Sequence, residues 1–183
     1  MNPLFKQRHS GYSFDKTKPV SAFVLKDLLN AARWAPSCYG EEPWRYIICE
    51  KDHKNGAYEK VFHALAKPNQ EWAKNAPLLI ISVADYTFRK TGKNNRWAAH
   101  DTGAASAYLC LQAAASGLMA HQMGGFNGPE LILEFGLPDD CIPMAVIAVG
   151  YEDSSAPPKE RSRNPFSYNF YEGAWKKGIK DPR

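Results

Sequence analysis

The chain has 183 residues, the size of one domain, and is long enough to bury a substantial core. Its hydrophobic content of 44% and aromatic content of 13% are those of a globular protein and exclude a largely disordered chain. The formal net charge is only +4, which is too small an excess of cations to indicate a nucleic-acid-binding protein.

The cysteines and the terminal sequence indicate the compartment. The four cysteines are far apart and form no CxxC pair, so we expect buried, reduced thiols. Residues 1–14 lack the apolar run and small-residue cleavage site of a signal peptide. The longest weakly polar stretch, residues 103–120, is rich in alanine, which favours close helix packing over exposure to lipid. We therefore expect a soluble, cytoplasmic protein with no membrane segment.

The first half of the chain shows alternating helix and strand patterns. Residues 19–34 have the apolar periodicity of an amphipathic helix. Residues 44–50 are rich in β-formers and predict a strand, and residues 52–66 predict a helix. Residues 68–75 are predicted to be a polar loop. Residues 78–84 are continuously apolar, which predicts a strand buried on both faces.

The second half continues the alternation. Residues 97–118 predict a long central helix, and residues 119–126 predict a strand. Asn127 is a suitable N-cap for a short helix that ends at Phe135. Residues 142–151 predict the last strand. This order predicts an α+β or α/β layered fold in which helices cover a sheet.

The last segment, residues 152–183, differs in composition from the rest. It is rich in proline, serine and charged residues, yet it contains several aromatic side chains, which a disordered tail does not need. We expect one domain with a core over residues 1–151, followed by an arm that packs on this core or on a partner subunit.

Several common catalytic motifs are missing from the sequence. It contains no GxGxxG after a strand, no GxxxxGK, no GxSxG and no HExxH. The five histidines show no metal-ligand spacing with one another or with the cysteines, so we predict no metal site.

Residues suited to an anionic ligand occur near both ends of the chain. Arg8 and Ser10 precede the first predicted helix, and Arg161 and Arg163 lie in the arm. Guanidinium forks and hydroxyls suit a phosphate. The two glycines at 124–125 allow a ligand to approach the backbone closely. The simpler alternatives are solvated basic turns and an ordinary bulge.

Three segments together resemble the FMN-dependent nitroreductases. They occur in the family's order and spacing over almost the whole chain, although each is weak alone. They are Arg8-His9-Ser10 followed by Phe14; residues 31–37 (AARWAPS) with residues 42–47 (EPWRYI); and residues 101–104 (DTGA) with Leu111, Ala114, Gly117-Leu118 and residues 123–126 (MGGF).

The resemblance implies a central, mostly antiparallel sheet flanked by helices, and a homodimer with FMN in a groove between two subunits. It implies that the FMN phosphate is held by Arg8, Ser10, Arg161 and Arg163, with His9 beside the ribityl chain. By the same resemblance, other residues contact the isoalloxazine ring: Pro36 and Ser37 from the partner subunit, Asn69 at the pyrimidine edge, and the backbone at Gly124 and Gly125 near N5 and O4.

The chain departs from the family pattern around the pyrimidine edge. Many members have a cation near N1 and O2, where this chain has Tyr12, and a second cation is replaced by Trp72. Tyr12 is nevertheless expected beside the flavin. Loss of cations there lowers the reduction potential of bound flavin, unless Arg8 or Arg45 takes over the role. Two further departures lie in the loop before the first strand, at Gly40 and Glu42.

The resemblance implies a ping-pong reaction in which NADH or NADPH donates hydride and a small planar acceptor receives it. A nitroaromatic, a quinone or an activated alkene fits that role, and no side chain is required as a catalytic acid or base. Alternatives are a flavin-binding protein without turnover, or a relative that fragments flavin or removes halogen. A basic nucleic-acid module rests only on the five cations Arg161, Arg163, Lys176, Lys177 and Lys180.

Overall fold

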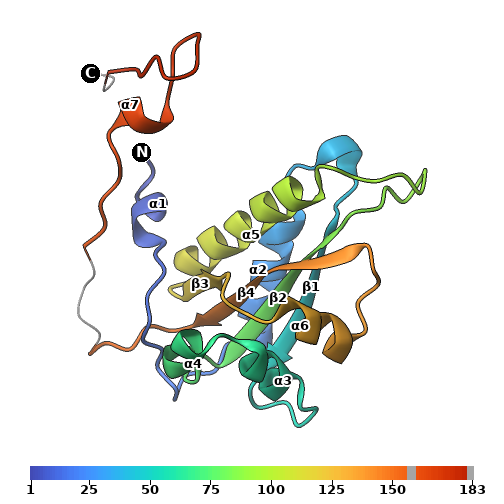
Figure 1. The fold of residues 1–183 in the computed structure, drawn as a ribbon. Coiled ribbons are helices and arrows are strands. Elements are labelled where there is room, and N and C mark those ends of the chain that lie inside the picture. The colour runs from blue at the N-terminus through green and yellow to red at the C-terminus, as the bar shows by residue number, and fades with distance from the viewer. Residues whose placement is uncertain (156–159, 181–183) are drawn as a thin grey trace.

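The computed structural model describes residues 1–155 and 160–180 (Figure 1). Its four strands form one sheet in the order β1-β2-β4-β3, and every neighbouring pair is antiparallel. The prediction of an α+β fold with a mostly antiparallel sheet is confirmed. The elements are α1 (Pro3–Gln7), α2 (Ala22–Arg33), the 3-10 turn η1 (Cys38–Gly40), β1 (Trp44–Glu50), α3 (Ala57–Ala64), α4 (Lys67–Ala73), β2 (Leu78–Asp85), α5 (Ala98–Ala115), β3 (Met119–Met123), α6 (Gly128–Phe135), β4 (Cys141–Gly150) and α7 (Phe166–Asn169).

Helices cover both faces of the sheet, as Figure 1 shows. Strand β2 demonstrates this, because alternate side chains of a strand point to opposite faces. Leu79 and Ile81 pack in the apolar cluster that includes residues of α3, α4 and α6. Leu78 and Ile80 pack in the cluster that includes residues of α2 and α5. All four are buried, which confirms the prediction of a strand buried on both faces.

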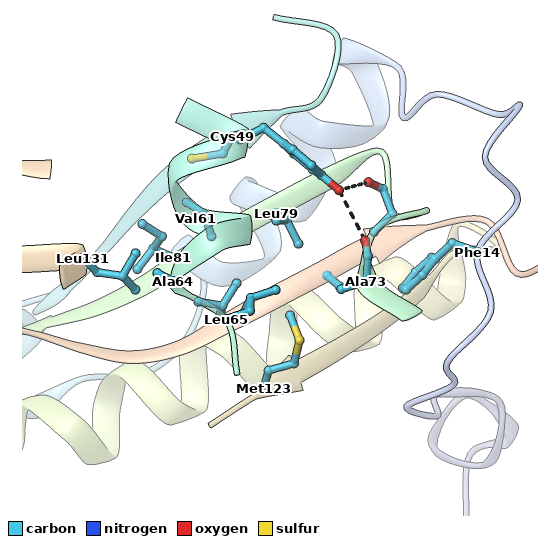
Figure 2. Close-up of a cluster of buried hydrophobic side chains, with 14 of the residues drawn as sticks. Phe14, Cys49, Val61, Ala64, Leu65, Ala73, Leu79, Ile81, Met123 and Leu131 are labelled. Carbon is cyan, nitrogen blue, oxygen red and sulfur yellow. Dashed lines mark hydrogen bonds between the residues drawn. The ribbon is translucent and has the colours of Figure 1, made fainter. Parts of the chain in front are cut away.

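The cluster on the α3, α4 and α6 side is shown in Figure 2. Val61 of α3 and Leu131 of α6 are fully buried in it. The hydroxyl of Tyr58 donates a hydrogen bond to the carbonyl of Ala76 at 2.8 Å and lies 3.3 Å from that of Ala73. Burial raises the pKa of Tyr58, so this side chain remains a neutral donor that ties α3 to the end of α4.

The long helix α5 lies on the opposite face. Leu109 is fully buried against the sheet, while Gly103, Ala107 and Tyr108 on the outer side of the helix are exposed. A hydroxyl contact joins Ser106 of α5 to the sheet, since its Oγ lies 3.0 Å from the Tyr46 hydroxyl. Among the residues that the structure describes, no helix is both long and apolar enough to cross a bilayer.

Several predicted boundaries were wrong. The helix predicted over 52–66 begins only after Gly56, whose left-handed φ of 71° is unfavourable for other residues inside a helix. The loop predicted over 68–75 is mostly helical, because α4 spans Lys67–Ala73 with a proline in its first turn. The strand predicted over 119–126 ends at Met123. The remaining predicted elements are confirmed within three residues at each end.

The N-terminal segment lies beside the described part of the arm, because Arg161 contacts the backbone of Arg8 and Lys6 (Figure 1). The N-terminal segment, predicted only as a polar lead-in, contains the short helix α1. In the arm, residues 160–170 and 172–178 are exposed, including the aromatic rings of Phe166, Tyr168 and Trp175. These rings therefore lack cover from the core of the same chain.

Candidate functional site

A pocket of about 290 Å³ opens beside α1, against α5 and β3. Arg8 and Ser10 lie at this pocket, and Nη1 of Arg8 lies 3.3 Å from Oγ of Ser10. The other lining residues are mainly apolar: Phe5, Ala107, Cys110, Leu111, Ala120 and Gln122. The pocket thus combines a cation and a hydroxyl with an apolar wall, which suits a ligand with an anionic end.

The electrostatics of this pocket are visible at Cys110. Burial raises the pKa of the Cys110 thiol, while the hydrogen bond from Gln122 and the positive charge of Arg8 act in the opposite direction. Nε2 of Gln122 lies 3.5 Å from the Cys110 sulfur. The thiol on the inner wall of the pocket is therefore neutral, because burial outweighs the other two contributions.

The arm reaches the same region through Arg161. One nitrogen of its guanidinium donates to the carbonyl oxygen of Arg8 at 2.5 Å, and the other donates to that of Lys6. Arg163 does not join them, because its Nη1 donates to the neighbouring carbonyl of Ser162. The structure therefore brings together Arg8, Ser10 and Arg161, three of the four residues predicted at a phosphate. Arg163, two residues after Arg161, is exposed.

His9 is held by its own segment and by the first residue of the arm. Its Nδ1 donates to the carbonyl oxygen of Gln7 at 2.9 Å, and its Nε2 lies 2.9 Å from Oε1 of Glu152. These contacts fix the segment that carries Arg8 and Ser10 against the start of the arm. They use both ring nitrogens of His9.

A second group joins α4 to the segment after β3. Nδ2 of Asn69 donates to the carbonyl oxygen of Gly125 at 3.0 Å, and the backbone N–H of Ala66 donates to the same oxygen at 2.9 Å. A Cβ on Gly125 would lie 2.9 Å from that amide nitrogen, whereas a Cβ on Gly124 would meet nothing within 4 Å. Both glycines are exposed, so their backbone is open to a ligand.

The two departures Tyr12 and Trp72 are in contact with each other. Their rings meet edge to face at 5.3 Å between centroids. Trp72 also stacks on His121 at 4.5 Å, and Nδ1 of His121 donates to the carbonyl oxygen of Gly11 at 2.8 Å. Aromatic packing therefore replaces the two expected cations. Tyr12 remains about half exposed at 49%.

Pro36 and Ser37 lie at the other end of α5. Oγ of Ser37 accepts a hydrogen bond from the backbone N–H of Glu42 at 3.0 Å. The next residue, Cys38, donates its backbone N–H to the buried carboxylate of Asp101 at 2.8 Å, near the start of α5. The pocket of Arg8 lies against residues 107–111, about 9–15 Å beyond Asp101 along the helix at 1.5 Å per residue. Within one chain, Pro36 and Ser37 therefore lie apart from Arg8 and Ser10.

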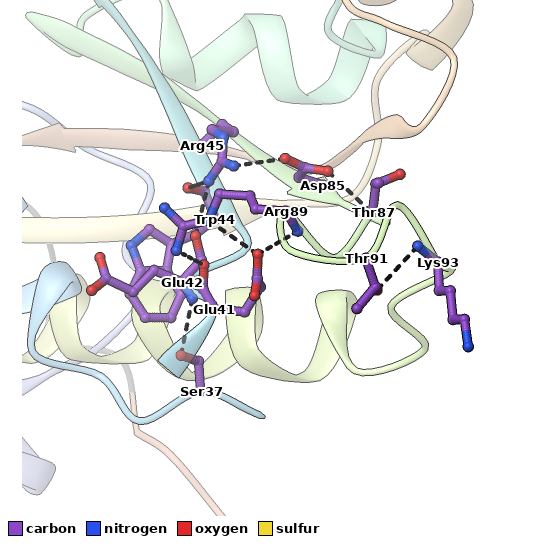
Figure 3. A network of polar contacts seen from close by, with 10 residues as sticks. All are labelled: Ser37, Glu41, Glu42, Trp44, Arg45, Asp85, Thr87, Arg89, Thr91 and Lys93. Carbon is purple, nitrogen blue, oxygen red and sulfur yellow. Dashed lines mark hydrogen bonds and ion pairs between the residues drawn. The ribbon is translucent and has the colours of Figure 1, made fainter. Parts of the chain in front are cut away.

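Figure 3 shows a polar network at this end that the sequence analysis missed. After β2 the chain turns back in a hairpin, closed by a bridge between Thr87 and Asn94. Arg89 in this hairpin donates to Glu41 through its backbone N–H at 2.6 Å and its Nε at 3.0 Å. The run of basic residues broken by Gly92 was the available sequence signal, but its pairing with Glu41 was not visible.

Arg45 belongs to the same network and not to the Arg8 pocket. Its Nη2 donates to Oδ2 of Asp85 at 2.6 Å, and its Nη1 donates to the carbonyl oxygens of Glu42 and Trp44 at 2.9 Å each. The guanidinium is thus committed to the end of β2. Among residues 1–155 and 160–180, no group of three or more His, Cys, Asp or Glu side chains is placed to hold a metal ion.

The sequence model of the nitroreductase family matches residues 5–151, which is most of the chain. The chain belongs to the nitroreductase family. The matched range includes the Arg8 pocket, the loop of Pro36 and Ser37, and the Asn69–Gly125 contact, but not the described part of the arm.

Solved and curated proteins of this kind resemble the chain over most of their length. An oxidoreductase described as containing FMN is 30% identical, with a TM-score of 0.87 and coverage of 96% of this chain and 92% of its own. A nitroreductase family protein from Clostridium difficile 630 is 26% identical, with a TM-score of 0.77 and coverage of 95% and 99%. The NADH dehydrogenase of Thermus thermophilus is 25% identical over 175 residues, covering 78% of this chain and 82% of that protein.

Proposed function

We propose that this nitroreductase-family chain is an FMN-dependent oxidoreductase that uses NADH or NADPH to reduce a small planar acceptor. The observation that carries the proposal is the pocket that combines Arg8 and Ser10 with apolar walls. The similar structure that contains FMN and the relative named as an NADH dehydrogenase support the two cofactors. The acceptor classes that suit a flat opening are nitroaromatics, quinones and activated alkenes.

The residues at the pocket fit the phosphate end of FMN. Arg8 and Ser10 would contact the phosphate directly, because a guanidinium and a hydroxyl supply donors to an anion. Arg161 would add positive charge while its hydrogen bonds hold the backbone of Arg8 in place. Arg163 would contribute charge from the exposed arm, and His9 would position the segment beside the ribityl chain.

The segment after β3 fits the polar edge of the flavin ring. The exposed backbone at Gly124 and Gly125 would donate toward N5 and O4, and Asn69 would contact the pyrimidine edge while holding Gly125. Tyr12 would lie beside N1 and O2, backed by Trp72. When bound, FMN would supply the hydride chemistry between the nicotinamide and the acceptor. The protein's contribution is position, exclusion of water and hydrogen bonding, with no side chain acting as acid or base.

We further propose that the working enzyme is a homodimer, with Pro36 and Ser37 of one chain covering the flavin of the other. The separation of these residues from Arg8 along α5 supports this arrangement. The exposed outer side of α5 and the exposed aromatic rings of the arm supply apolar surface for a second copy. In this view residues 1–151 form the core, and the arm from residue 152 packs on the partner. The four free cysteines support a cytoplasmic location.

One observation favours a second candidate, a flavin-binding protein that nicotinamides do not reduce. The aromatic contact between Tyr12 and Trp72 occupies the place of the expected cations, and fewer cations disfavour the anionic reduced flavin. The two candidates differ in whether a nicotinamide reduces the bound cofactor.

The test is the visible absorption spectrum of the purified protein supplied with FMN, recorded anaerobically before and after addition of NADPH or NADH. The oxidoreductase proposal predicts a bound-flavin spectrum that bleaches with at least one of the two coenzymes. A bound flavin that stays oxidised with both would favour the binding protein. A protein that takes up no FMN would reject both candidates.

A further inference from the structure

The segment after β2 carries several cations and no acidic residue. Residues 86–100 contain four cations, Arg89, Lys90, Lys93 and Arg96, and no acidic residue. The rest of the chain carries 19 Lys and Arg, the total of 23 less these four, against 19 Asp and Glu. This segment therefore carries a net charge of +4 by itself, and the rest of the chain is balanced. A concentration of one sign at one place attracts a ligand of the opposite sign.

The segment has a defined shape. The backbone N–H of Phe88 donates to the carbonyl of Lys93 at 2.9 Å, and that of Gly92 donates to the carbonyl of Phe88 at 2.8 Å. Gly92 has a φ of 65°, the left-handed conformation that glycine adopts without strain. These contacts form the hairpin that follows β2 and place Lys90 and Lys93 near its tip.

Arg89 anchors the hairpin, so the other three cations are available to a ligand. Arg89 is bound to Glu41, and the ring of Phe88 meets that of Tyr39 at 6.2 Å. Both contacts hold the hairpin beside the loop that carries Pro36 and Ser37, as Figure 3 shows for Ser37, Glu41 and Arg89. Glu41 is buried, with 7% of its surface exposed, and Arg89 supplies its hydrogen bonds, while the charge of Lys90 adds to the lowering of its pKa.

The remaining cations face solvent. Lys90, Lys93 and Arg96 are exposed, and within the described parts of the chain none of them forms an ion pair with an acidic side chain. Arg96 lies over the ring of Trp97, 4.4 Å from the ring centroid, and this contact orients its guanidinium. Three like charges on one short segment repel one another, and an anion bound between them relieves that repulsion.

We propose that Lys90, Lys93 and Arg96 bind the 2′-phosphate of a phosphorylated nicotinamide dinucleotide, so that the enzyme prefers NADPH to NADH. This inference rests on the proposed function, in which Pro36 and Ser37 cover the partner's flavin. The hairpin then stands at the rim of the opening where nicotinamide stacks, and the adenosine end of the coenzyme extends outward over it. NADPH differs from NADH by one phosphate, which carries about −1.5 to −2 charges at neutral pH.

The test compares adenosine 2′,5′-bisphosphate with AMP by calorimetry, using the full-length FMN-loaded protein. Wild type is expected to bind the bisphosphate about 10-fold more tightly, because two or three charge-assisted contacts form with the extra phosphate. The double variant Lys90→Gln/Lys93→Gln is expected to lose that advantage. A matched control, Lys26→Gln/Lys54→Gln, removes the same charge from exposed sites in α2 and in the turn before α3, and is expected to keep that advantage.

Flavin reduction supplies the second readout. The double variant is expected to lower the second-order rate constant with NADPH about 10-fold and to leave the NADH rate and the FMN content unchanged. Equal affinity of wild type for the two adenosine ligands, or selectivity retained in the double variant, would overturn the proposal. The proposal would also be overturned if the double variant bound both adenosine ligands as wild type does and lost only binding to an acidic protein or to DNA. Flavin that neither coenzyme reduces would reject the proposed function, and the calorimetry would still decide whether the phosphate site exists.

Discussion

The two ends of α5 carry the two halves of the proposed site, and they are held in different ways. Near its start, the loop of residues 36–42 is fixed by buried carboxylates, Asp101 to the backbone of Cys38 and Glu41 to Arg89. Further along, the segment of Arg8 and Ser10 is held mostly by exposed contacts, such as those of His9 and Arg161. Hydrogen bonds and ion pairs to a buried side chain hold a loop more strongly than those to an exposed side chain, because water competes for the exposed ones.

This difference indicates which half is formed in advance. The loop of Pro36 and Ser37 and the neighbouring hairpin are built by the chain alone. The segment of Arg8 is held by exposed hydrogen bonds, for which water competes. We therefore expect this segment to become ordered when the phosphate and a second subunit bind. Changes at the first end should therefore affect stability, and changes at the second should affect ligand binding.

The largest effect is expected at the ligand end. Arg8→Ala removes the guanidinium from the pocket, and FMN affinity should fall by about 10- to 100-fold, the size of a lost charge-assisted hydrogen bond to phosphate. The measurement is a titration of FMN fluorescence quenching. Lys16→Ala, an exposed cation outside the pocket, is the control and should bind FMN normally. Unchanged FMN affinity in Arg8→Ala would remove Arg8 from the phosphate site.

At the preformed end, Asp101→Ala should destabilise the fold by about 1–3 kcal/mol, because it leaves the backbone N–H of Cys38 without its partner. Urea denaturation followed by fluorescence measures this. Asp101→Asn keeps an acceptor oxygen and should lose less. Asp52→Ala, at an exposed position, should be neutral. A loss confined to FMN affinity, with stability unchanged, would contradict the assignment of Asp101 to structure.

The aromatic contact between Tyr12 and Trp72, proposed to lie at the pyrimidine edge of the flavin, predicts a smaller effect. Tyr12→Lys would place a cation at a half-exposed position beside the flavin, and it should raise the reduction potential by on the order of 20–30 mV. Anaerobic titration against redox dyes of known potential measures the shift. Tyr12→Phe keeps the ring without the charge and should shift the potential much less. A potential that Tyr12→Lys leaves unchanged would place residue 12 away from the ring.

The smallest effect concerns pH at the hairpin. The hydrogen bond from the backbone of Arg89 lowers the pKa of Glu41 below its ordinary value of 4.5. A carboxylate with a lowered pKa stabilises the fold above its unfolded-state pKa, and this contribution is lost as the pH falls through the folded value. Stability should therefore decline slightly more steeply below pH 4.5 in wild type than in Glu41→Gln. Parallel pH profiles for the two proteins would show that Glu41 does not contribute.

Much of the fold was predictable from the sequence because its core elements carry strong patterns. The strand over 44–50 was predicted with its observed bounds, and the apolar run from Leu78 could form only a buried element. Helix α4 was missed because it has seven residues, of which only Ala73 is fully buried, so no apolar period was visible. The hairpin after β2 was missed because its cations and glycine are equally typical of a solvated loop.

The site was less predictable than the fold. The motif residues were found through the family resemblance, which gave no contact between Asn69 and Gly125. The pairing of Arg89 with Glu41 and the contact of Tyr12 with Trp72 depend on tertiary packing, which local patterns do not encode. The distance between Ser37 and Arg8 also appears only once α5 is placed, since it follows from the length of that helix.

The central claim, that FMN binds between two chains, is tested most directly by a mixed dimer. Arg8→Glu and Pro36→Glu would be co-expressed with different tags, and the heterodimer purified through both, after each variant alone is shown to lose FMN. If the site is shared, one of its two copies carries both defects and the other carries none, so we predict about one FMN per two chains. A heterodimer that binds no FMN would show that each site lies within one chain and would contradict the account.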